Sequence, residues 1–319
     1  MNKIIDCVSI AQKVKDEVKQ EVLQMENAPC LTVVIVGDDP ASQVYVRNKE
    51  KVCEEVGIKS KTIRLSGDID QYALETVVKS LNEEPTVHGI LVQLPLPKHL
   101  NEQQVIDCID PRKDVDGLTT ENMGLIMRGR IDEAIVPCTP SGVLRMFDEI
   151  GYDLQGKNVT IVGRSNLFSK PMFHLALSRN ATVTMCHSKT INLMNKTVNA
   201  DVLISAIGQP KHFGFYDIGK GACVVDVGIN RDENGGLCGD VNLDEVINSV
   251  EYITPVPRGV GTLTTAMLLK NVLKVLKTIG QLLGGCYRWK DQITHKTFSR
   301  SNMGWTLMMR RLMDLLTTL

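Results

Sequence analysis

The stretch NVTIVGRSNLFSKP, residues 158–171, combines the pattern of a buried strand with a glycine turn and the start of a helix. It opens a series in which strand, glycine turn, helix, strand, helix and strand follow one another through residue 229. That order is typical of the mononucleotide-binding half of a doubly wound fold, where ligands bind beyond the carboxyl ends of the strands. The turn keeps only the first glycine of the G-x-G-x-x-G pattern, so by itself it is a weak dinucleotide signature.

The end of the second strand in this series bears on the choice of cofactor. NAD enzymes place a carboxylate there to hold the ribose 2′-OH, whereas this chain has His187-Ser188-Lys189. These side chains would accept a 2′-phosphate, and Arg164, just after the first strand, could clamp the same phosphate. The pattern therefore favours NADP over NAD. The alternative is that Arg164 and Ser188 are exposed loop residues in a lobe that binds something else.

A similar alternation fills the first part of the chain. It predicts strands at 31–37, 61–66 and 87–97, and helices at 40–57, 71–84 and 101–110. Short strands that alternate with helices are typical of a parallel sheet covered on both faces. A helix at 139–151, with Thr139 as its N-cap, leads into the nucleotide-binding series, and an amphipathic helix at 264–280 follows that series.

We therefore expect an α/β protein with two α/β lobes around a cleft, the second of them a Rossmann-type NADP-binding domain. The expected first domain is 1–139, completed by a C-terminal helix at 264–285. The expected second domain is 140–263, and residues 286–319 form an extension. That extension is basic from Arg288 onward. It is either a dispensable terminal segment or a contact for a membrane surface or a partner.

Composition limits the classes of function. The chain has 319 residues, 43% of them hydrophobic and 23% charged, with a formal net charge of -1. This balance is that of a soluble globular protein, and it argues against nucleic acid or an anionic membrane as the main partner. Charges interrupt the first residues, so we expect no signal peptide. Nine cysteines without a C-x-x-C pair predict reduced thiols in a cytoplasm, and neither disulfides nor a metal site.

Tyr45 and Lys49 lie four residues apart in a predicted helix and so share one of its faces. The spacing matches the catalytic pair of short-chain dehydrogenases. In those enzymes the pair follows the glycine turn and lies in the same domain. Here the pair comes well before the turn at Gly163 and lies in the other lobe. The short-chain interpretation is therefore disfavoured.

Gln93 and Asp116 follow strand ends in the first lobe. Because the carboxyl ends of parallel strands share one edge, these two residues could converge with Tyr45 and Lys49. A lysine beside apolar walls loses its charge readily and suits acid–base chemistry. An aspartate matches the adjacent N–H donors of a pterin, and a tyrosine offers a stacking face. Taken singly, Asp116 is explained by its turn and Lys49 by a solvated helix face. Only their convergence favours a functional site.

Eight motifs, taken in order, resemble the methylenetetrahydrofolate dehydrogenase/cyclohydrolase family. They are GDDPASQVYVRNKEKVCEEVGI, GILVQLPLP, PRKDVDGL, PCTPSGV, VGRSN…KP, TVTMCHSKT, VVDVGIN and YITPVPRGVG. The resemblance runs from about residue 3 to about residue 280. It implies an enzyme that oxidises 5,10-methylenetetrahydrofolate with NADP and then hydrolyses the methenyl product to 10-formyltetrahydrofolate. That chemistry belongs to one-carbon metabolism and purine biosynthesis. The alternatives are a single-activity dehydrogenase and a non-catalytic folate- or nucleotide-binding relative.

The resemblance also implies roles for individual residues and makes 1–139 the folate-binding domain. Lys49 is then the catalytic residue of the hydrolysis, Gln93 supports it, Asp116 binds the pterin and Tyr45 lies over the folate. The other expected substrate-binding residues are Val92, Leu94, Pro257, Arg258, Gly259, Val260 and Gly261. The expected NADP-binding residues are Gly163, Arg164, Ser165, Ser188 and Ile229. The family is usually homodimeric and cytosolic or mitochondrial.

Two segments depart from the family's usual pattern. PRGVGTLT stands in place of P-G-G-V-G-P-M-T, so that Arg258 replaces a glycine where a positive φ is expected, and Thr262 replaces a proline. SNLFSKP stands in place of S-x-I-V-G-K-P, so that Phe168 and Ser169 replace a small pair. Both departures lie where a ligand is expected to approach closely.

Overall fold

A computed structural model describes residues 3–295 of the chain, with side chains described as far as residue 278. The described residues up to Leu276 form one compact unit, which contains everything discussed below. Within the described residues, we found no helix that is both long enough and apolar enough to span a membrane.

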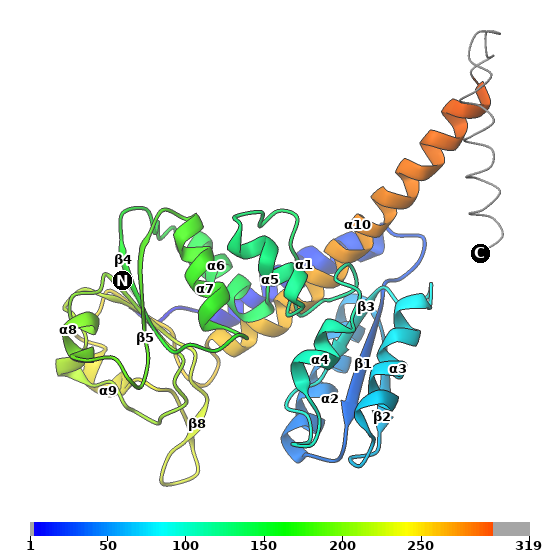
Figure 1. The fold of residues 1–319 in the computed structure, drawn as a ribbon. Helices are drawn as coiled ribbons and strands as arrows, with labels where there is room; N and C mark the ends of the chain where they lie inside the picture. The colour runs from blue at the N-terminus through cyan, green and yellow to red at the C-terminus, as the bar shows by residue number, and fades with distance from the viewer. Residues whose placement is uncertain (1–2, 296–319) are drawn as a thin grey trace. The chain divides into compact units, whose positions relative to one another are not determined.

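The first lobe is built on a three-stranded parallel sheet with the order β2-β1-β3. The central strand is almost entirely buried, as its run of β-branched residues predicts. The strands are β1 (Cys30–Val36), β2 (Lys59–Leu65) and β3 (Gly89–Val92). The helices of this lobe are α1 (Cys7–Leu23), α2 (Pro40–Val56), α3 (Gln71–Glu83) and α4 (Glu102–Asp107). Figure 1 shows α2 and α3 packed beside the sheet.

The helix α2 carries Tyr45 and Lys49 and has well-defined ends. Asp39 caps its first turn by accepting a hydrogen bond of 2.8 Å from the backbone N–H of Ser42. Pro40 occupies the first helical position, and Gly57 ends the helix in a left-handed conformation with φ of 82°. The sequence signals for both ends are confirmed. The helix therefore begins directly after β1, and its first turns lie at the carboxyl edge of the sheet.

The second lobe is built on a five-stranded parallel sheet with the order β10-β7-β6-β4-β5. Its strands are β4 (Asn158–Val162), β5 (Thr182–Cys186), β6 (Val202–Ser205), β7 (Cys223–Asp226) and β10 (Tyr252–Ile253). Because β5 and β6 pair on opposite sides of β4, the chain reverses direction across the sheet at β4. Such a switch point is where a doubly wound fold binds its ligand. The fold is therefore α/β, and the second lobe is Rossmann-like, as predicted.

The remaining elements connect and cover the two sheets (Figure 1). They are the helices α5 (Thr120–Met127), α6 (Cys138–Glu149), α7 (Ser169–Ser178), α8 (Leu193–Thr197), α9 (Leu243–Val246) and α10 (Val260–His295), the 3-10 turn η1 (Phe215–Asp217), and the short hairpin of β8 (Asn230–Arg231) and β9 (Leu237–Cys238). The hairpin follows β7 directly, so it lies at the carboxyl edge of the second sheet.

Three expectations need correction or comment. Thr139 is not the N-cap of α6, because the helix begins one residue earlier, after Pro137, which fixes the backbone without a side-chain cap. The Thr139 hydroxyl instead lies 3.0 Å from that of Thr264. The helix predicted at 264–280 begins at Val260. Our expectations for the extension at 286–319 concern side chains that lie outside the described residues.

Candidate functional site

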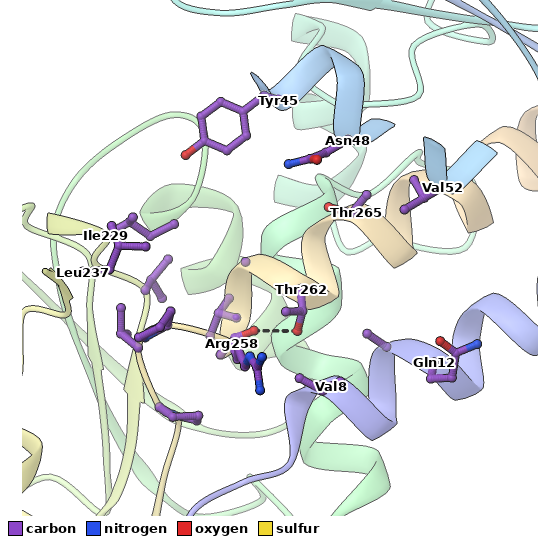
Figure 2. A pocket seen from close by; sticks show the side chains of 18 of the residues that line it. Val8, Gln12, Tyr45, Asn48, Val52, Ile229, Leu237, Arg258, Thr262 and Thr265 are labelled. Atoms are coloured by element: carbon purple, nitrogen blue, oxygen red, sulfur yellow. Dashed lines mark hydrogen bonds between the residues drawn. The ribbon is translucent and has the colours of Figure 1, made fainter. Parts of the chain in front are cut away.

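Tyr45 and Lys49 line a cavity of about 550 Å³, which is within the range of small-molecule sites. Four segments of the chain, together with Leu237 of β9, form its walls. The segments are α1 from Val8 to Lys15, α2 from Tyr45 to Glu55, the end of β7 from Asp226 to Ile229, and the segment 255–265 that enters α10. Figure 2 shows how the labelled side chains from these segments surround the cavity. Both lobes therefore contribute to one cleft.

Lys49 is half-buried, and its Nζ donates a hydrogen bond of 2.9 Å to Oε1 of Gln93. Gln93 is buried at the end of β3, and its Nε2 donates to the backbone oxygen of Leu94 at 2.6 Å. This second bond fixes the amide so that its oxygen faces the lysine. The pairing follows from topology, because α2 leaves β1 at the same edge where the neighbouring strand β3 ends.

Asp116 lies in a turn that is held from behind by another aspartate. The carboxylate of Asp114 is buried and accepts hydrogen bonds of 2.8 Å from the backbone N–H groups of Gly117 and Thr119. It also accepts a bond of 3.1 Å from Nδ2 of Asn122. Burial raises the pKa of Asp114, and these hydrogen bonds lower it in part. Asp114 therefore fixes the turn that presents Asp116.

Cys138, at the start of α6, links Asp116 to Lys49. Its Sγ lies 3.5 Å from Oδ1 of Asp116. Burial raises the pKa of this thiol well above its usual value, and nearby Asp116 raises it further whereas Lys49 lowers it. Both charged groups therefore lie near the same buried thiol. Asn271 of α10 completes the arrangement, because its Nδ2 donates to the backbone oxygens of Val115 and Val136 at 2.9 Å.

The structure thus brings together most of the residues predicted for the folate side. Tyr45, Lys49, Ile229 and the segment 257–261 line the cavity. Four residues predicted for the folate side do not line it: Val92, Gln93, Leu94 and Asp116. Of these, Gln93 is hydrogen-bonded to Lys49, and Asp116 lies 3.5 Å from the thiol of Cys138. Sequence reasoning did not assign roles to Asp114, Cys138 and Asn271. The signals that could have found them are the first aspartate of KDVDGL, the cysteine of PCTPSGV, and a polar residue in the apolar stripe of α10.

The glycine turn after β4 is packed closely against neighbouring parts of the chain. Gly163 has φ of 139°, and a Cβ there would lie 2.6 Å from Oγ of Ser169 and 2.7 Å from the oxygen of Ala206. Ser165 uses its hydroxyl to accept from the backbone N–H groups of Phe168 and Ser169, at 3.2 and 3.3 Å. Phe168 and Ser169 are both buried. The larger side chains at 168 and 169 therefore pack inward and do not cover the turn.

Arg164 and Ser188, the two residues predicted to select the cofactor, are both exposed. Ser188 sits in a tight turn, in which the N–H of His187 donates to Thr190 Oγ1 at 2.8 Å and the N–H of Lys189 donates to His187 Nδ1 at 3.1 Å. These two residues do not line the 550 Å³ cavity, and neither do Gly163 and Ser165. Of the five residues predicted to bind the cofactor, Ile229 alone lines this cavity.

Two buried aspartates hold the segment that carries Ile229. Asp226 Oδ1 accepts from the N–H groups of Gly228 and Asp240 at 3.0 Å, and its Oδ2 accepts from that of Val241 at 2.8 Å. Burial raises the pKa of Asp226 to about 6, and the nearby Asp240 raises it as well. Gly228 has no room for a side chain, because a Cβ there would overlap the Asp240 carboxylate.

Asp240 connects the same segment to the end of β6. Its Oδ2 accepts from Ser205 Oγ at 2.9 Å and from the N–H of Ile207 at 2.8 Å. Its Oδ1 accepts from the N–H of Gln209 and from Asn230 Nδ2, both at 2.9 Å. Because Asn230 follows Ile229 directly, the two carboxylates together fix where Ile229 faces the cavity.

The segment 255–262 forms the wall opposite α2. Gly259 must be glycine, because a Cβ there would overlap the backbone oxygen of Pro255. Thr262 Oγ1 donates to the oxygen of Gly259 at 2.7 Å, which is the dashed contact in Figure 2. Arg258 has φ of 69° and is exposed to the cavity. Within the described residues, no cluster of three or more His, Cys, Asp or Glu side chains is arranged to hold a metal ion.

Comparison with known proteins assigns a family to both lobes. The family model for the tetrahydrofolate dehydrogenase/cyclohydrolase catalytic domain matches residues 5–116. The model for the NAD(P)-binding domain of the same family matches residues 137–279. Among curated relatives, the bifunctional protein FolD of Agathobacter rectalis is 46% identical over 280 residues, covering 87% of this chain and 100% of the relative. The FolD protein of Streptococcus agalactiae is 50% identical over 276 residues, covering 85% and 96%.

Solved structures agree with these matches. The bifunctional FolD of Campylobacter jejuni superposes with a TM-score of 0.84 at 42% identity, covering 86% of this chain and 98% of that one. The Trypanosoma brucei dehydrogenase-cyclohydrolase, solved in complex with NADP cofactor and an inhibitor, gives a TM-score of 0.82 at 37% identity, covering 86% and 97%.

Proposed function

The chain belongs to the tetrahydrofolate dehydrogenase/cyclohydrolase family, and we propose that both reactions of that family take place in the cavity lined by Tyr45 and Lys49. The protein oxidises 5,10-methylenetetrahydrofolate to the 5,10-methenyl compound with NADP, and hydrolyses that compound to 10-formyltetrahydrofolate. The observation that carries the placement is the hydrogen bond from Lys49, which lines the cavity, to Gln93.

In the proposed hydrolysis, Lys49 moves the proton of the attacking water. The amidinium carbon of the methenyl compound needs a water beside it that can lose a proton. Gln93 Oε1 accepts one N–H of Lys49 and so holds the side chain in one direction. Asp116, held by the turn around Asp114, would accept the paired N–H groups of the pterin.

NADP would bind the second lobe at the turn after β4, where Gly163 holds a φ of 139° and lies against Ser169 and Ala206 too closely for any side chain. We propose that Gly163, Arg164, Ser165, Ser188 and Ile229 hold it, with Arg164 and Ser188 on the 2′-phosphate. When bound, NADP supplies a hydride acceptor. Ser165 contributes by ordering the first turn of α7. Ile229, fixed by the two buried aspartates, gives the cofactor a defined wall at the cavity.

One spectrophotometric experiment tests this function. The protein is given 5,10-methylenetetrahydrofolate with NADP or with NAD, and the absorbance of the methenyl product is followed as it forms and then decays. We expect faster formation with NADP, and a decay faster than in an enzyme-free control. Absence of formation would support a non-catalytic folate- or nucleotide-binding protein. Formation with only spontaneous decay would support a single-activity dehydrogenase.

We also propose a homodimer in the cytoplasm that supplies one-carbon units for purine biosynthesis, with folate- and NADP-binding domains divided at residues 139 and 140. The absence of C-x-x-C pairs supports the reducing compartment. The eight cysteines that the structure describes are free thiols. Sedimentation equilibrium tests the dimer, because a mass of one chain, 35.3 kDa, would contradict it.

A further inference from the structure

Arg258 adopts a backbone conformation that arginine rarely takes. Four non-glycine residues among those described have positive φ, and two of them are asparagines, which tolerate it. The others are Lys211, with φ of 51°, and Arg258, with φ of 69°. Arg258 is the one of the four that lines the cavity. Because glycine would adopt this backbone conformation at less cost, the arginine at this ligand site raises the question of what its side chain does.

The charges around the cavity leave Arg258 available for an anion. Lys15 is paired with Glu55 at 3.0 Å, and Lys49 is bonded to Gln93. The Asp226 carboxylate is buried and turned toward backbone N–H groups. Within the described part of the chain, the Arg258 guanidinium has no hydrogen bond or ion pair. Lys51 of α2 also lines the cavity and is exposed, and among the described residues it has no hydrogen bond or ion pair either. The cavity therefore presents two uncompensated cations, Lys51 on α2 and Arg258 on the wall formed by the segment before α10.

Arg258 lies on a different wall of the cavity from Tyr45 and Lys49, where we place the reacting end of the folate. Tyr45 and Lys49 belong to α2, whereas Arg258 belongs to the opposite wall, and Figure 2 shows its guanidinium on the side toward Val8 of α1. A reduced folate has a pterin at one end, an aminobenzoyl group in the middle and a glutamate with two carboxylates at the other end. If the pterin lies near Asp116 and the aminobenzoyl group at Tyr45, the part of the folate that remains to contact the Arg258 guanidinium is the glutamate with its two carboxylates.

We propose that Arg258 binds a carboxylate of the glutamate end of the folate and thereby sets the affinity for this substrate. The inference rests on the proposed function and extends it to a residue outside the chemistry. A guanidinium matches a carboxylate with two parallel N–H···O bonds. Because Arg258 is exposed, water screens the pair, and we expect an effect of about fivefold on KM. The phosphates of NADP are the competing anions, but Arg164 and Ser188 lie outside this cavity.

The test compares two substrates in four proteins. The substrates are 5,10-methylenetetrahydrofolate and its analogue in which both glutamate carboxylates are amides. The proteins are the wild type, Arg258→Ala, Arg258→Gly and Arg258→Lys. We expect both truncations to raise KM for the natural substrate about fivefold, with the lysine variant between. KM for the diamide, KM for NADP and kcat are expected to stay at wild-type values.

Lys211→Gly is the matched control, because it relieves a similar backbone strain outside the cavity and is expected to leave both KM values unchanged. An unchanged or lower folate KM in Arg258→Gly would overturn the proposal, since Arg258 would then be neutral or obstructive. A rise in KM for NADP alone would assign Arg258 to the cofactor and would also overturn it. Wild-type protein without any turnover would instead refute the proposed function, and calorimetric binding of the two folates would then decide the role of Arg258.

Discussion

Asp226 is a carboxylate whose ionisation the folded protein opposes, so its replacement should change how stability depends on pH. Burial raises the pKa of Asp226 from 3.8 to about 6. Because the folded-state pKa exceeds the unfolded one, the native protein binds more protons between these values. The resulting stabilisation is complete below the unfolded pKa and is lost as the pH rises through the folded one. Linkage between the two pKa values gives about 1.4 kcal/mol of lost stability from pH 5 to pH 7.5.

The assay is urea unfolding of the wild type and Asp226→Asn between pH 5 and pH 7.5. The asparagine does not titrate, and its amide N–H faces the N–H of Gly228, Asp240 or Val241, which costs about 1–3 kcal/mol at every pH. We expect the stability difference, wild type minus variant, to be about 1.4 kcal/mol larger at pH 5 than at pH 7.5. Asp38→Asn, at an exposed position, is the control. A difference that is constant, or that grows toward pH 7.5, would refute the reasoning.

Three further predictions concern the site and its supports. Asp114→Ala releases the turn of Gly117 and should raise KM for the folate about tenfold without changing KM for NADP, as steady-state kinetics would show; equal changes in both would contradict it. Ser188→Asp should lower kcat/KM for NADP at least about tenfold relative to NAD, because a carboxylate repels a 2′-phosphate; an unchanged ratio would remove Ser188 from the cofactor site. Gly239→Ala should lower the unfolding free energy by about 2 kcal/mol or more, because its Cβ overlaps the Asp226 carboxylate; a neutral effect in thermal unfolding would contradict the crowding.

Local patterns were sufficient to predict the three strands of the first sheet, four of the five strands of the second and the ends of α2; the two-residue edge strand β10 is too short to show a pattern. Apolar runs such as the one in β1 report burial on both faces, and Pro40 and Gly57 act on the backbone within a turn of their own positions. The meeting of Lys49 and Gln93 could also be expected, because parallel strands end at one edge of a sheet. These features depend on periodicity and topology, which a sequence carries directly.

The supports of the site could not be predicted in the same way. Cys138 and Asn271 act through contacts between segments that are distant in the chain. Asp114 bonds to residues close to it in the chain, but its role depends on the burial of its carboxylate, which the turn sequence does not show. Phe168 is a second case in which the sequence did not show how a side chain is packed. It replaces a small residue where a ligand is expected to approach closely, but its side chain is buried. A side chain's direction depends on tertiary packing, which no local pattern specifies.

The most direct test of the central claim is hydrolysis of 5,10-methenyltetrahydrofolate by Lys49→Met. This change removes the ammonium that Gln93 holds at the cavity wall while keeping an unbranched side chain. Lys19→Met, on an exposed face of α1, is the matched control, and unfolding curves show that both variants are folded. We predict that Lys49→Met clears the methenyl compound no faster than buffer, whereas Lys19→Met clears it at the wild-type rate. Clearance by Lys49→Met at a near-native rate would contradict the assignment of this lysine to the hydrolysis.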